Sequence, residues 1–133
     1  MSDHILITQR LRLRRLSRDD ARHVLSACKS PGFTDGMTWE PTQTEEETHV
    51  FTDEALALWE KGEKFVWTIE DGNDATFIGR VEVKRARELP GNTWTLGYWI
   101  HPTQQRKGFA TEAANEAIRF AFEELKADSI VSS

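Results

Sequence analysis

The segment Gln105-Arg106-Lys107-Gly108-Phe109-Ala110 combines two basic side chains with a glycine and lies where a strand pattern changes to a helix pattern. Backbone N–H groups at the start of a helix have no acceptor within the helix, and the helix dipole adds a positive field there. The small residues at 108 and 110 allow an anionic group to approach these N–H groups. Residues 106–111 therefore predict a phosphate-binding turn, although a plain strand-to-helix connection would use the same elements.

The residues before this turn predict a strand. Large apolar side chains at every second position share one of its faces: Trp94, Leu96, Tyr98 and Ile100. A period of two residues is typical of a strand with one buried face. The only tyrosine, Tyr98, is therefore expected in the core rather than as a catalytic acid. Gly97 inside the strand indicates a bulge or a close approach of another backbone.

The residues after the turn predict a long helix. Apolar residues recur at the three- and four-residue spacing of one buried stripe: Ala110, Ala113, Ala114, Ala117, Ile118, Ala121, Phe122 and Leu125. The alanines would let this helix pack closely on a sheet. Ile130-Val131 then begins a strand, and a strand, helix, strand unit predicts that it lies parallel to strand 94–100.

Patterns in the rest of the chain predict the elements that hold these parts in place. Helix starts are indicated by Ser17 with Asp20 and by Thr44 with Glu47, because each pair has capping-box spacing. The expected ranges are a strand at 10–16, a helix at about 18–29, a second helix from 44 to about 61, and an antiparallel hairpin of strands 65–69 and 77–83. The order β-α-α-β-β-β-α-β predicts one mixed α/β domain over residues 1–133.

The segment from Leu96 to Ala113 resembles the acetyl-CoA-binding signature of the Gcn5-related N-acetyltransferase (GNAT) superfamily. The family pattern Arg/Gln-x-x-Gly-x-Gly/Ala corresponds to Gln105-x-x-Gly108-x-Ala110. Near the other end of the chain, residues 8–14 and 19–21 (Thr-Gln-Arg-Leu-Arg-Leu-Arg and Asp-Asp-Ala) resemble the opening of the branch that acetylates ribosomal-protein N-termini. The order of elements is also the one that the resemblance implies.

The resemblance implies an acyltransferase that moves an acetyl group from acetyl-CoA to a primary amine, with a peptide or ribosomal-protein N-terminus as the expected acceptor. It places the CoA pyrophosphate on the glycine turn and pairs the pantetheine arm with the backbone from Trp99 to His101. The cofactor-binding residues expected on this basis are Trp99, Ile100, Gln105, Arg106, Lys107, Gly108, Phe109, Ala110 and Thr111.

Transfer to an amine requires a base, because only the neutral amine attacks the thioester. Glu82 in strand 77–83 and His101 at the end of strand 94–100 are the candidates. Each also has a structural interpretation, Glu82 as an exposed strand carboxylate and His101 as a cap on the strand end. A backbone N–H near Ile100 is the candidate donor to the tetrahedral oxyanion.

The composition excludes other classes of function. The chain has 17 Lys and Arg against 22 Asp and Glu and a net charge of −5, whereas nucleic-acid binders usually carry a basic excess. Apolar runs are short and the first residues lack signal-peptide features, so we predict no membrane partner and a cytoplasmic location. The single cysteine, Cys28, cannot form an intrachain disulfide. The histidines lack metal-ligand spacing, so we predict no metal.

Members of the family continue past the last strand with a further helix and a strand pair, and this sequence lacks them. A sheet edge expecting those strands would be exposed. We therefore expect a homodimer whose second copy covers that edge. The alternative is a catalytically impaired module that binds CoA or a protein partner.

Overall fold

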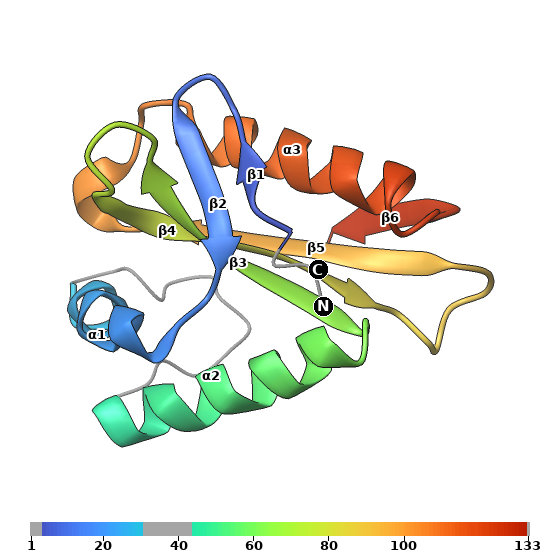
Figure 1. The fold of residues 1–133 in the computed structure, drawn as a ribbon, viewed down its shortest axis with the longest axis horizontal. Coiled ribbons are helices and arrows are strands. Elements are labelled where there is room, and N and C mark those ends of the chain that lie inside the picture. Colours follow the sequence, from blue (N-terminus) through green and yellow to red (C-terminus); the bar gives the residue numbers. More distant parts are fainter. Residues whose placement is uncertain (1–3, 31–43, 133) are drawn as a thin grey trace.

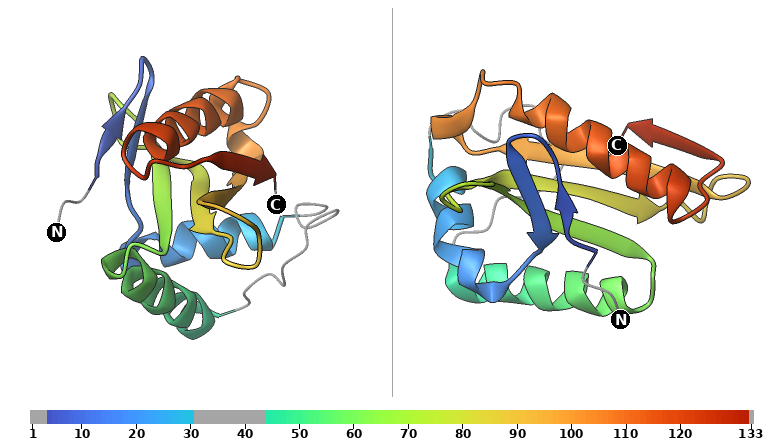
Figure 2. Two further views of the ribbon diagram at one scale, coloured as in Figure 1. Left: turned by 90° about the vertical axis from the view of Figure 1, so that its right-hand side faces the viewer. Right: turned by 45° about the horizontal axis from the view of Figure 1, so that its top comes forward.

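A computed structural model of the chain describes residues 4–30 and 44–132. They form a six-stranded sheet in the order β1-β2-β3-β4-β5-β6, in which β5 and β6 run parallel and all other neighbours run antiparallel. The helix α3 covers one face of this sheet, and α1 and α2 cover the other (Figures 1 and 2). The elements are β1 (Leu6–Ile7), β2 (Leu11–Arg15), α1 (Ala21–Cys28), α2 (Glu45–Glu60), β3 (Lys64–Asp71), β4 (Phe77–Arg85), β5 (Thr93–Ile100), α3 (Phe109–Glu123) and β6 (Ser129–Ser132).

The predicted mixed α/β order is confirmed, with two local differences. The short strand β1 was not predicted; Leu6 pairs with Leu13 of β2 at the edge of the sheet. The first helix begins as a single 3-10 turn over Arg18–Asp20, closed by the predicted capping box of Ser17 and Asp20, before it continues as α1. Both differences involve segments of only two or three residues, which are too short for a periodic pattern to predict.

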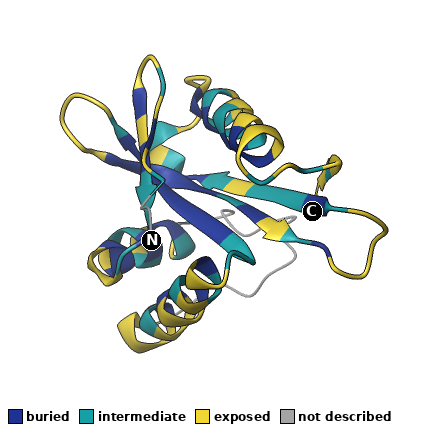
Figure 3. Cartoon of the chain, turned by 45° about the vertical axis from the view of Figure 1, so that its right-hand side comes forward, coloured by how far each residue is buried: buried dark blue, intermediate teal, exposed yellow. Residues whose placement is uncertain are grey.

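The main core lies between the sheet and α3 (Figure 3). The alanines at 113, 117 and 121 are fully buried, as the stripe predicted, and they bring α3 close to the strands. Phe120 is 1% exposed and packs edge-on against Phe65 and Trp67. Phe122, which the stripe placed in the core, is 45% exposed. That prediction was wrong, because Phe120 and Ala121 already fill the face that α3 turns to the sheet.

Tyr98 was also predicted in the core and is 54% exposed. It shares a sheet face with buried Trp94 and Ile100, but β6 accompanies β5 only as far as Leu96. Within the described residues, the side chain of Tyr98 therefore has a strand beside it only on the β4 side, where it pairs with Val81. Alternation along a strand gives the face of a side chain and does not show whether another element covers it.

The close backbone approach expected at Gly97 occurs at Gly79 instead. A Cβ atom on Gly79 would lie 2.2 Å from the carbonyl oxygen of Trp99, so only glycine fits between β4 and β5 there. Gly97 pairs regularly with Glu82. The one register shift between β3 and β4 lies at Ile69 and Glu70.

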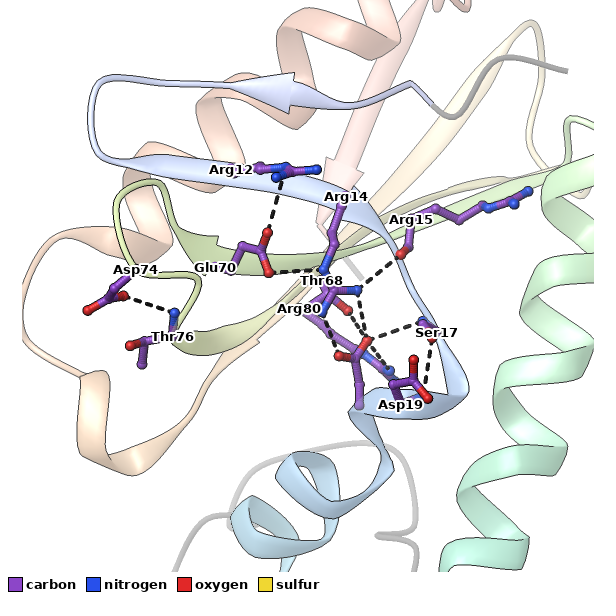
Figure 4. A network of polar contacts seen from close by, with 11 residues as sticks. Arg12, Arg14, Arg15, Ser17, Asp19, Thr68, Glu70, Asp74, Thr76 and Arg80 are labelled. Carbon is purple, nitrogen blue, oxygen red and sulfur yellow. Dashed lines mark hydrogen bonds and ion pairs between the residues drawn. The ribbon is translucent and has the colours of Figure 1, made fainter.

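The sheet face that α1 and α2 cover carries a buried group of charged residues. Asp20 is 2% exposed and accepts hydrogen bonds from the guanidinium of Arg14 at 2.7 Å and from Thr68 Oγ1 at 2.7 Å. Arg80 Nη2 lies 3.6 Å from Asp20, and Arg14 also donates to Glu70 (Figure 4). These contacts tie β2, β3 and β4 to the start of α1. We call Arg14, Asp20, Thr68, Glu70 and Arg80 the Asp20 network.

Burial alone would raise the pKa of Asp20. The hydrogen bonds from Arg14 and Thr68, together with the positive charges of Arg14 and Arg80, outweigh it and hold the pKa of Asp20 below its ordinary value. Asp20 is therefore ionised at neutral pH and balances the buried charge of Arg80, which is 4% exposed.

Candidate functional site

A cleft of about 430 Å³ opens where β5 extends beyond its parallel neighbour. The pairing of β5 with β6 ends at Leu96 and Ser132, whereas β5 continues to Ile100 along β4. The cleft lies between the end of β5, the connection after it and the first turn of α3. Its lining residues are Tyr98, Trp99, Ile100, Gln104, Gln105, Arg106, Gly108, Phe109, Ala110 and Thr111.

The main chain of β5 presents polar groups to this cleft. The Thr93 carbonyl accepts a hydrogen bond from the N–H of Ala86, which directly follows β4. The His101 N–H donates to the carbonyl of Ile78 in β4, so both groups face β4. Because main-chain groups alternate in direction along a strand, those of Tyr98 and Ile100 point to the opposite side, toward the cleft. The sequence placed the pairing edge at Trp99 to His101; the structure shows that the His101 N–H is bonded to the Ile78 carbonyl at 2.7 Å.

The glycine turn after β5 has the backbone shape of an anion-binding concavity. Arg106 and Gly108 both adopt left-handed conformations, with φ of 66° and 80°. Gly108 is the N-cap of α3. In the described part of the chain, the N–H groups of residues 108–111 have no hydrogen-bond acceptor, whereas that of Glu112 bonds to the Gly108 carbonyl. Successive N–H groups on such a turn are suited to phosphate oxygens.

The side chains of this turn have different roles in the structure. Gln105 Nε2 donates to the Ile100 carbonyl at 3.1 Å and so fixes the turn to the end of β5. Phe109 is buried in the core and anchors the first turn of α3. Arg106, Lys107 and Thr111 are exposed and can reach a bound anion from the surface. The structure therefore places all the predicted cofactor-binding residues except Lys107 in the lining of one cleft, and Lys107 lies in the turn beside it.

Two further residues contact this turn and were not among the predicted site residues. Arg10, which lies between β1 and β2, donates from Nη1 to the Lys107 carbonyl at 2.9 Å and from Nε to Glu112 Oε1 at 2.7 Å. Arg10 and Glu112 are 102 positions apart in the chain. The N-terminal resemblance included Arg10, but nothing local to either residue indicates the contact.

Comparison with known proteins agrees with this geometry. Residues 10–133 match the family model described as an acetyltransferase (GNAT) domain. The chain belongs to the GNAT acetyltransferase family. No curated protein matches it significantly.

Solved structures with the same fold include a proposed ribosomal-protein-serine acetyltransferase of Vibrio cholerae, with a TM-score of 0.77 and 27% identity over 95% of this chain and 71% of that one. The ribosomal-protein-S5-alanine acetyltransferase of Vibrio fischeri has a TM-score of 0.79 and 20% identity over 98% and 73% of the two chains. The spermidine N-acetyltransferase of Vibrio cholerae, in complex with CoA and spermine, has a TM-score of 0.76 and 23% identity over 92% and 70%.

In this GNAT domain, the two candidate bases lie in different settings. Glu82 projects from β4 on the face of α1 and α2, opposite Gly97, with its side chain 31% exposed and Lys64 Nζ at 3.8 Å. His101 follows β5, and its Nδ1 accepts from the backbone N–H of Thr103 at 3.2 Å. Nε2 therefore carries the proton and donates to Ser26 Oγ, 3.1 Å away. Burial and the nearby His23 lower the pKa of His101, so its ring is neutral at neutral pH.

The described part of the GNAT domain has neither a metal-binding cluster nor a membrane-spanning helix. Across residues 4–30 and 44–132, no cluster of three or more His, Cys, Asp or Glu side chains is arranged to hold a metal ion. Over the same ranges, no helix has the length and apolar character needed to cross a membrane.

Proposed function

We propose that this chain transfers the acetyl group of acetyl-CoA to a primary amine, with a peptide or ribosomal-protein N-terminus as the acceptor. The amine nitrogen attacks the thioester carbonyl, the carbon–sulfur bond breaks, and the proton lost by the nitrogen balances the charge on the departing CoA thiolate. The protein must bind CoA beside the acceptor, take the ammonium proton and stabilise the oxyanion.

The observation that carries this proposal is the cleft between β5 and the start of α3. It combines a strand edge, at Tyr98 and Ile100, with a helix N-terminus whose N–H groups have no acceptor in the described chain. A pantetheine arm carries amide groups that can pair with such an edge, and a pyrophosphate suits the helix start. The cleft can therefore receive both parts of CoA in one extended pose.

We assign the base role to Glu82 first, because His101 Nδ1 already accepts a backbone hydrogen bond. The main-chain N–H of Ile100 is the proposed oxyanion donor, since alternation along β5 directs it to the cleft. Glu82→Gln is expected to lower kcat by about a hundredfold, the usual contribution of a positioned base, with little change in acetyl-CoA affinity. His101→Asn serves as the comparison; a larger loss of kcat in that variant would transfer the base role to His101.

The first experiment measures acetyl-CoA binding by calorimetry and CoA release with a panel of N-terminal peptides and polyamines. Binding in the micromolar range with turnover on a peptide supports the proposal. No heat of binding at high micromolar acetyl-CoA would exclude it. Binding without turnover on any amine would favour the alternative, a CoA-binding module without catalysis.

The proposal extends to assembly and location. β6 pairs with β5 on one side only within the described residues, and Val131 on it is 39% exposed. A second copy pairing along this edge would cover the unpaired side of β6 and the side chain of Val131. Light scattering after size-exclusion chromatography is expected to give twice the chain mass, and a monomer at micromolar concentration would rule this out. The proposed location is the cytoplasm, which cell fractionation would test.

A further inference from the structure

Arg10 joins the β1–β2 turn to the start of α3 through several contacts. Its Nη1 donates to the Lys107 carbonyl, its Nε to Glu112 Oε1, and its backbone N–H to Glu112 Oε2 at 2.9 Å. Thr8 Oγ1 also donates to Glu112. The guanidinium carbon lies 4.6 Å from the centre of the Phe109 ring. We call Thr8, Arg10, Lys107, Phe109 and Glu112 the Arg10 bracket.

The bond to Lys107 controls the direction of a donor in the glycine turn. The carbonyl of Lys107 and the N–H of Gly108 belong to one planar trans peptide and point in opposite directions. When Arg10 holds that carbonyl, the Gly108 N–H is directed away from Arg10. Gly108 is otherwise able to adopt many conformations, since glycine has the fewest backbone restrictions. Arg10 therefore supplies an orientation that the turn lacks by itself.

The bonds to Glu112 remove an electrostatic obstacle. Glu112 lies in the first turn of α3, where a free carboxylate would repel a bound phosphate. Burial alone would raise the pKa of Glu112, but hydrogen bonds from Thr8 and Arg10 outweigh it and lower the pKa. The ionised carboxylate is thus tied to the β1–β2 turn and paired with the Arg10 charge.

We propose that Arg10 is a positioning residue for the diphosphate of CoA, which orients the Gly108 N–H through Lys107 and neutralises Glu112 at the start of α3. This inference rests on the proposed function. It adds a residue from the β1–β2 turn to a cofactor site otherwise built from β5 and α3. A merely structural pair would leave the affinity for the cofactor unchanged once the protein is folded.

The test compares Arg10→Met with Arg12→Met. Arg12 is a matched control: its side chain is 48% exposed against 45% for Arg10, and it also pairs with a glutamate, but that glutamate is Glu70 on β3 rather than a residue of α3. Each variant is titrated with acetyl-CoA by calorimetry, and KM is measured for acetyl-CoA and for acetyl-pantetheine, which lacks the diphosphate. Circular dichroism and Tm establish that the variants are folded.

Arg10→Met is expected to weaken acetyl-CoA binding by about tenfold or more, the loss typical of charge-assisted hydrogen bonds, with KM for acetyl-pantetheine unchanged. Arg10→Lys restores the charge but cannot bond to both the Lys107 carbonyl and Glu112. Its Kd for acetyl-CoA is therefore expected between those of the wild type and Arg10→Met. This variant tests the proposal if Arg10→Met does not fold. Arg12→Met is expected to bind as the wild type does.

Equal acetyl-CoA affinity in Arg10→Met and the wild type would overturn the inference, as would equal losses for the two acetyl donors. Either result is distinct from failure of the proposed function, in which the wild-type protein itself would not bind acetyl-CoA. A fall in Tm alone, with Kd unchanged, would assign Arg10 a structural role only.

Discussion

The Asp20 network and the Arg10 bracket use the same chemistry at two depths of burial. In each, an arginine from β2 or the turn before it binds a carboxylate near the start of a helix. Asp20 is 2% exposed on the sheet face that α1 and α2 cover, whereas the side chains of Arg10 and Glu112 are 45% and 19% exposed at the start of α3. We therefore expect the two pairs to differ in what they contribute to folding stability and to cofactor affinity.

Burial determines that difference. A buried charge that loses its partner is strongly destabilising, whereas a pair near water adds little to the free energy of unfolding because solvent screens it. The Asp20 network should be necessary for folding and nearly irrelevant to cofactor affinity. The Arg10 bracket should show the reverse. Four predictions test this contrast.

The largest effect is expected from Asp20→Asn. This change leaves the guanidinium of Arg80, 4% exposed, without its carboxylate. The free energy of unfolding is expected to fall by about 3–5 kcal/mol, the cost of breaking a buried pair. Urea denaturation gives this value, with Asp53→Asn as control because Asp53 pairs with Arg18 at the surface. If both variants were equally stable, burial would not separate the two kinds of pair.

The second prediction concerns acid. The pKa of Asp20 is lower in the folded chain than in the unfolded one. The ionised carboxylate therefore makes its full contribution to the free energy of unfolding above the unfolded pKa, about 4, and this contribution is lost as pH falls toward the folded pKa. One such proton changes the free energy of unfolding by at most about 1.4 kcal/mol per pH unit. The stability gap between the wild type and Asp20→Asn, measured in urea from pH 7 to pH 3, should narrow below about pH 4. A gap that stays constant would show that Asp20 is not the titrating group.

The third prediction concerns Gly108→Ala. Gly108 has φ of 80°, and an added Cβ would lie 3.3 Å from Arg10 Nη2. The left-handed conformation costs an alanine about 1 kcal/mol, so a modest loss of stability is expected. The displaced guanidinium should also weaken acetyl-CoA binding. Calorimetry on the folded variant separates the two effects, and unchanged affinity would mean that the contact between Gly108 and Arg10 is incidental.

The contrast between the two regions also explains what could be predicted from the sequence. The glycine turn, β5 and α3 were predicted because each follows from residues that are neighbours in the chain. Tyr98 was misplaced because its burial depends on where β6 ends. Arg10 and Glu112 were not connected because the contact spans 102 positions and follows from the packing of α3 beside β2. The core pattern is local, whereas the support of the site is tertiary.

Glu112→Gln is expected to give the smallest change in acetyl-CoA affinity. The sign of that change distinguishes the effect of the Glu112 charge from the effect of Glu112 in holding Arg10 in the Arg10 bracket. The change removes a negative charge beside the proposed phosphate site and leaves the bond from Arg10 to the Lys107 carbonyl in place. Removing one water-screened charge near the diphosphate is worth about 0.5 kcal/mol, so acetyl-CoA affinity should rise about twofold. The free energy of unfolding should fall slightly, because a negative charge in the first turn interacts favourably with the helix dipole and the change removes it. Calorimetry at low salt measures the affinity. A large loss of affinity would instead show that Glu112 orders the turn, because Arg10 would then need its carboxylate partner to hold Lys107 in position.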